Sequence, residues 1–162
     1  MFDDDSGADF LPAKLMVMVI VAALLIVLTA SGMADLAGAH SEYQARAEAD
    51  RIYELARLSY AGDCPGQSAG RSLDVSVPST VRMIAFGAIP VNGTTVRADR
   101  SYFIEYSNGR SDTYVSDIPF ACDQPDGPAD VPLLLYPGKY YLTVSPASLN
   151  GSYKACIRAE AA

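Results

Sequence analysis

Three cysteines, Cys64, Cys122 and Cys156, are the side chains in this chain with the clearest capacity for chemistry. No CxxC pair occurs and the single His40 is far from all three in sequence, so we do not expect a zinc site. One reading is a disulfide plus a spare thiol, which suits an oxidising exterior, and the other is three reduced thiols in a cytosolic domain. We predict a Cys64–Cys122 disulfide, with Cys122–Cys156 as the alternative pairing.

No arrangement of side chains typical of catalysis is visible. His40 has no evident nucleophile or acid as a partner, and there is no glycine-rich phosphate loop. Asp123, Asp126 and Asp130, near Gly127, do not have the spacing of a calcium-binding loop and indicate a solvated turn. The net charge of -7 argues against a nucleic-acid partner. We therefore predict a protein that is not an enzyme and has no cofactor and no metal.

Two N-x-[ST] tripeptides start at Asn92 and Asn150, both in expected loops. They predict glycosylation of these asparagines and thus an extracellular location. Each asparagine is also followed by glycine, a dipeptide that favours tight turns on its own.

Leu15–Ala34 contains no charged residue, and twenty apolar residues in a helix span a hydrocarbon core of ~30 Å. The preceding tail is acidic and holds one basic side chain, Lys14, which favours a retained transmembrane anchor over a cleaved signal peptide. The first basic residue after the anchor is Arg46, so the positive-inside rule places the tail inside and the rest of the chain outside the cell.

The residues from Asp35 to Tyr60 are rich in Ala, Glu, Arg and Leu and predict a helical extension of the anchor. Small residues recur at every fourth position on two adjacent lines of this helix, which lets neighbouring helices approach closely. The helix-packing residues that we predict on these lines are Ala30, Ala34 and Gly38 on one and Ala37, Ser41, Ala45 and Ala49 on the other.

After Gly70 the hydrophobic pattern has a period of two, which predicts about seven short strands. Asn108-Gly109 favours a type I′ hairpin between 102–107 and 110–116, and Pro137-Gly138 indicates a second hairpin between 133–136 and 139–144.

The predicted fold class is α+β, with a long N-terminal helix (transmembrane plus extension) followed by an antiparallel β-sandwich-like domain. Its parts are a tail at 1–13, the helix at 14–61 and an extracellular β-domain at 62–162.

A short tail, an apolar segment, a helical extension and a β-domain together resemble the layout of the type IV pilin superfamily, which includes archaellum proteins. The segments VSVPSTVRMIAF, YFIEYSNG and LLLYPGKYYLTV are similar to those of membrane-anchored pilin-like proteins of archaea. The resemblance implies a membrane-anchored or filament-assembled protein whose helix packs with copies of itself or with other pilin-like subunits. We therefore expect a structural subunit or minor component of a cell-surface filament. The alternative is a monomeric, membrane-anchored adhesion or envelope-contact domain.

Overall fold

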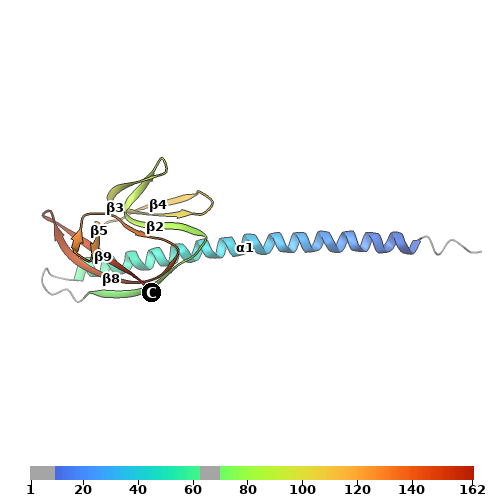
Figure 1. Ribbon diagram of the computed structural model, residues 1–162, viewed down its shortest axis with the longest axis horizontal. Helices are drawn as coiled ribbons and strands as arrows, with labels where there is room; N and C mark the ends of the chain where they lie inside the picture. Colours follow the sequence, from blue (N-terminus) through green and yellow to red (C-terminus); the bar gives the residue numbers. More distant parts are fainter. Residues whose placement is uncertain (1–9, 63–69) are drawn as a thin grey trace, which may run out of the picture. The chain divides into compact units, whose positions relative to one another are not determined.

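The computed structural model describes residues 10–62 and 70–162, except for the side chains of residues 10–13, 31, 34, 35 and 37. In these described ranges one helix, α1 (Phe10–Gly62), precedes nine strands (Figure 1). The chain divides into two compact units, Met1–His40 and Ser41–Ala162. The second unit therefore consists of the last part of α1 and all of the strands.

The strands form two sheets. The first has the order β1-β8-β9-β5-β6 and the second the order β4-β3-β2-β7. Their bounds are β1 (Arg71–Val77), β2 (Val81–Val91), β3 (Thr94–Tyr106), β4 (Ser111–Val115), β5 (Phe120–Gln124), β6 (Gly127–Ala129), β7 (Leu133–Leu135), β8 (Gly138–Leu149) and β9 (Ser152–Ala161).

Within the second unit, α1 contributes one apolar face to the core shared by both sheets. The positions buried on this face are spaced by three or four residues, which is the helical repeat. They are Ala45, Ala49, Ile52, Ala56 and Ser59. Four of the five are alanine or serine, and their small side chains allow the helix backbone to lie close to the strands.

The sheets contribute the larger core side chains, including Ile84, Leu142 and Ile157. Tyr102 stands in a group of aromatic rings: its ring stacks on those of Phe86 and Tyr114, with centroids 5.3 and 4.9 Å apart. Pairs of this geometry contribute about 0.5–1.5 kcal/mol beyond their buried area.

Salt bridges and hydrogen bonds join this part of α1 to the β3–β4 hairpin and the segment after it. Arg46 pairs with Asp112 at 2.5 Å, and Arg110 pairs with Glu42 at 2.6 Å. The Tyr53 hydroxyl donates to Asp117 at 2.7 Å. The helix is thus fixed to the sheet by polar contacts at the rim of an apolar core.

The hairpin predicted around Asn108-Gly109 is confirmed as β3–β4, but its turn is not type I′. A type I′ turn needs positive φ at both central residues, whereas here only Gly109 has positive φ, at 83°. The Arg110 N–H donates to Asn108 Oδ1 at 2.9 Å, and the Gly109 N–H donates to the Tyr106 carbonyl at 3.0 Å. These bonds match a three-residue loop that ends in a left-handed glycine.

The predicted fold class was wrong in its transmembrane assignment. Over residues 10–62 and 70–162, no helix is both long enough and apolar enough to cross a membrane. The run of alanine and large apolar residues from Leu15 ends at Leu28, before Thr29. At 1.5 Å per residue this run covers about 20 Å, less than the ~30 Å of a hydrocarbon core.

The β-sandwich-like domain was predicted to be antiparallel, but one of its strand pairs, β5 with β9, is parallel. The hairpin predicted around Pro137-Gly138 does not form. Instead, β7 pairs with β2, while β8 pairs with β1 and β9, so the chain passes from one sheet to the other between β7 and β8.

Candidate functional site

The first unit carries a helical segment that is apolar on all sides, Leu15–Leu28 of α1, hereafter the apolar segment. Every large apolar side chain in it is between 49% and 69% exposed. Seven consecutive residues from Leu15 to Val21 are of this kind, and at 3.6 residues per turn they surround the helix. A helix that is hydrophobic all round is normally buried, so the segment is a candidate interface.

The helix-packing residues predicted from sequence fall into three groups. Ala30 is exposed in the first unit, and the glycine at 38 is half-buried. Ala34 and Ala37 lie in α1, but their side chains are outside the described residues. Ser41, half-buried, and Ala45 and Ala49, fully buried, belong to the second unit, where the two alanines are part of the core.

The two alanines of the second unit are thus covered by their own domain. Of the other described positions on the small-residue lines, Ala30 and Gly38 are in the first unit. Apart from its chain neighbours and the adjacent helix backbone, a Cβ atom built on Gly38 has no atom within 4 Å.

A charged cluster surrounds Lys154, whose side chain is only 5% exposed although it lies on β9. Lys154 Nζ donates to Asp99 Oδ2 and to Asp130 Oδ1, both at 2.6 Å. Arg97 Nε donates to Asp99 Oδ1 at 2.7 Å, and the Arg97 guanidinium also pairs with Asp130. Asn150 Nδ2 donates to Asp130 Oδ2 at 3.3 Å. Hereafter this set is the Lys154 cluster.

Sequence reasoning did not identify the Lys154 cluster. Its only local signal is that the β9 residues Lys154, Cys156 and Arg158 alternate with the core residues Ala155 and Ile157. Arg158 in turn pairs with Asp123 at 2.9 Å. The face of β9 opposite the core is therefore lined by paired charges.

The ion pairs of the Lys154 cluster shift the pKa values of its aspartates and of its lysine. Arg97, and then Lys154, lower the pKa of Asp99 from 3.8 to about 2, against the opposing effect of burial. Lys154 and then Arg97 lower the pKa of Asp130. Burial would lower the pKa of Lys154, but its bonds to Asp130 and Asp99 raise it. Both carboxylates and the ammonium are charged at neutral pH, as expected of a structural ion network.

We expect the cluster to make the second unit sensitive to acid. Because folding lowers the pKa of Asp99, its contribution to stability is present above about pH 4 and is lost as the pH falls towards 2. In Asp99→Asn this part of the pH dependence disappears, so its unfolding midpoint in urea changes less than that of the parent chain between pH 5 and 2. Asp126→Asn, at an exposed position, should keep the parental profile.

The predicted disulfide was wrong: Cys122 and Cys156 are both free thiols, and Cys64 lies outside the described residues. The alternative Cys122–Cys156 bridge is also excluded by the register. Cys122 pairs with Ile157 and packs against the core, whereas Cys156 pairs with Ala121 on the opposite face of the sheet. Burial raises the pKa of both thiols, that of Cys156 to about 11, which makes them poor nucleophiles.

Both predicted glycosylation asparagines are exposed and lie in hairpin turns. Asn92 and Gly93 join β2 to β3, and Asn150 and Gly151 join β8 to β9. The two asparagines have positive φ, 47° and 52°, and so do the glycines that follow them. Both are therefore type I′ turns. Turn geometry accounts for both dipeptides, and glycosylation of the asparagines stays a prediction.

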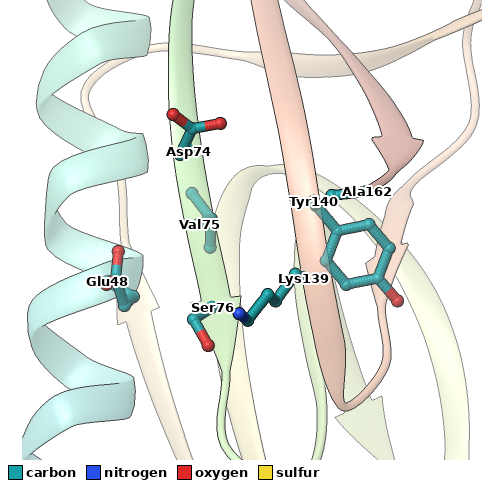
Figure 2. A pocket seen from close by; sticks show the side chains of 7 residues that line it. All are labelled: Glu48, Asp74, Val75, Ser76, Lys139, Tyr140 and Ala162. Atoms are coloured by element: carbon teal, nitrogen blue, oxygen red, sulfur yellow. The ribbon is translucent and has the colours of Figure 1, made fainter.

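A hollow of about 300 Å³ lies beside α1 in the second unit (Figure 2). Its lining consists of Glu48, Asp74, Val75, Ser76, Lys139, Tyr140 and Ala162. The Glu48 carboxylate already pairs with Arg51 at 2.9 Å. Ser76 has no histidine among these neighbours to act as its base, so the lining does not form a nucleophile–base pair.

In the part of the chain that the structure describes, no group of three or more His, Cys, Asp or Glu side chains is placed to hold a metal ion. No protein family, curated protein or solved structure matches the chain. A functional proposal therefore depends on the chain's own features, above all on the apolar segment.

Proposed function

We propose that this protein is a non-enzymatic structural subunit that assembles with copies of itself through the apolar segment of α1, as pilin-like subunits do in a surface filament. The observation that carries the proposal is the all-round exposure of Leu15–Leu28. Exposed apolar surface of this extent marks an interaction site.

The geometry of the segment favours copies of the same chain as partners. One groove or one partner helix covers a single side of a helix, but here apolar side chains point in every direction. An array of identical helices covers each member on all sides. Small residues within and after the segment, such as Ala22, Ala23 and Ala30, let the backbones approach closely.

The proposed filament lies at the cell surface, with the second unit on its outside. Asn92 supports this placement because it is exposed in a turn, where a glycan would not disturb the sheets. A glycan on Asn150 would attach to the Nδ2 atom that donates to Asp130. An antibody against the second unit should then label fibres on intact cells.

We expect Gly38→Leu to weaken self-assembly by about tenfold or more, corresponding to a loss of ~1.4 kcal/mol or more per contact. Added bulk at a small-residue position prevents close approach of neighbouring helices. A Cβ at Gly38 has no atom within 4 Å other than those of its chain neighbours and the adjacent helix backbone, so the start of the new side chain has room. The full chain is purified in detergent, the detergent is removed, and assembly is followed by light scattering and electron microscopy.

Gly32→Leu is the matched control. It makes the same change in the same helix, also without an atom within 4 Å of the new Cβ, but off both small-residue lines. It should assemble like the parent chain. If the parent chain stays monomeric after detergent removal, the filament proposal is wrong and a monomeric adhesion domain replaces it. If Gly38→Leu assembles as well as the parent chain, the small-residue lines are not part of the interface.

A further inference from the structure

Among the strands that the structure describes, β4 lies at an edge of its sheet and pairs only with β3. The Tyr106 N–H donates to the Arg110 carbonyl and the Ser116 N–H to the Arg100 carbonyl, which fixes the alternation along the strand. Even-numbered residues from 110 to 116 bond to β3. The backbone N–H and C=O groups of Ser111, Thr113 and Val115 therefore point away from β3, towards the open edge.

This edge lacks the protection that other sheet edges in the described residues have. β6 and β7 have three residues each, and β6 contains Pro128; β1 carries the charged Arg71 and Asp74. In β4 the three residues with outward backbone groups are uncharged and exposed, and Val115 is 87% exposed. Natural edges usually carry charges, proline or a bulge that prevents pairing. The one charged residue of β4, Asp112, bonds to β3 through its backbone and pairs with Arg46. The outward positions of β4 have none of these protective features, so they form a template for another strand.

We propose that the β4 edge pairs with the β4 edge of a second copy of this chain, antiparallel and about a two-fold axis through Thr113. In this register Thr113 faces Thr113 of the other copy, and Ser111 faces Val115. All three pairs are hydrogen-bonded pairs, which uses the outward N–H and C=O groups of every one of these residues.

The charges of the strand fit this register. Asp112 faces Tyr114 of the second copy rather than another carboxylate, and it is already paired with Arg46 of its own chain. The residue opposite Arg110 is Ser116. No like charges meet across the axis, and Thr–Thr pairs are favourable neighbours in antiparallel sheets. The β4 strand of one copy is thus complementary to the β4 strand of a second copy.

The two-fold contact is independent of the helix interface proposed above. In a filament that grows by repeating one helix contact, all subunits point the same way along the filament axis. A contact between two oppositely oriented subunits therefore does not occur within it. Pairing through β4 therefore joins two chains, or two filaments, side by side. The helix contact builds a filament, and the β4 contact bundles filaments.

Cysteine crosslinking of the full chain in detergent tests the register, because detergent covers the apolar segment and separates the two interfaces. Under mild oxidation, Thr113→Cys should give a disulfide-linked dimer, since facing Cα atoms in such a pair are ~5.5 Å apart. Ser111→Cys alone should give at least tenfold less dimer, because the two copies of residue 111 are ~13 Å apart along the strands. Ser111→Cys mixed with Val115→Cys should crosslink, and the parent chain reports any background from the native cysteines.

Thr113→Pro is the complementary variant. Proline removes the outward N–H of residue 113 but no bond to β3, so β4 remains in its sheet and the dimer is lost. Filaments formed through the helix should persist as single fibres without bundles. Equal crosslinking of Ser111→Cys and Thr113→Cys, or a Thr113→Pro chain that still dimerises, overturns the proposal. The proposal is also overturned if the parent chain is monomeric in detergent and none of the cysteine variants crosslinks, which would leave the edge to a strand of another protein.

Discussion

Replacing Lys154 with methionine is expected to lower the free energy of unfolding of the second unit by about 3 kcal/mol. The side chain of Lys154 is 5% exposed and lies 2.6 Å from each of two carboxylates. Methionine fills a similar volume but leaves Asp99 and Asp130 close together, with Arg97 as the one cation that pairs with both and Asn150 as a neutral donor to Asp130. The side chains of these aspartates are 37% and 25% exposed, so water compensates in part and the effect falls at the low end of the range for buried pairs. Urea unfolding at pH 7 measures it.

The matched control is Lys139→Met, which removes an exposed ammonium from the neighbouring strand β8 and should change stability by less than about 0.5 kcal/mol. The double variant Lys154→Met with Asp99→Asn should recover part of the loss, because it also removes one unpaired charge. Equal stability of Lys154→Met and Lys139→Met would show that the Lys154 cluster does not stabilise the fold.

The Lys154 cluster was not predicted from the sequence because its members are far apart in the chain. Lys154 is 55 residues from Asp99 and 24 from Asp130. A lysine that alternates with apolar residues on a strand normally faces solvent. Here β3 and the segment before β7 supply the carboxylates that cover it. Pairing of this kind depends on tertiary arrangement, which periodicity does not encode.

Local patterns were more informative about where elements lie than about how they pair. The helical composition of 35–60 and the alternation of 102–107 and 110–116 correspond to α1, β3 and β4. Pro137-Gly138 signals a reversal of the chain but not its partner, and the strands on either side belong to different sheets. The three Asn-Gly dipeptides adopt two kinds of turn. The turn at Asn108 is the three-residue loop, in which the Arg110 N–H donates to the asparagine side chain.

The same limit applies to the small-residue lines of the helix. Their spacing indicates close packing but not the identity of the partner. Ala45 and Ala49 pack within their own domain, and Ile52 follows them on the same face. The sequence does not distinguish these alanines from Ala30, which is exposed. The difference arises because Ala45 and Ala49 belong to the core that the strands build within the second unit.

Ile52→Ala is expected to lower the free energy of unfolding of the second unit by about 3 kcal/mol. Ile52 is fully buried, and it is the largest side chain that α1 places in the core at less than 2% exposure. Truncation removes apolar surface from the core cluster and leaves a cavity that the small neighbours Ala49 and Ala56 do not fill. Urea unfolding of the full chain in detergent, followed by tyrosine fluorescence, measures the loss.

Leu58→Ala is the control, because Leu58 is on the same helix but 53% exposed, and its loss should cost less than about 1 kcal/mol. Ile52→Ala should still assemble below its unfolding midpoint, since the apolar segment is unchanged. Gly38→Leu should show the opposite behaviour, with normal unfolding and weak assembly. Ile52→Ala could instead abolish assembly while its second unit remains folded. In that case, it is wrong to assign one part of α1 to the core of the second unit and another part to the contact between copies.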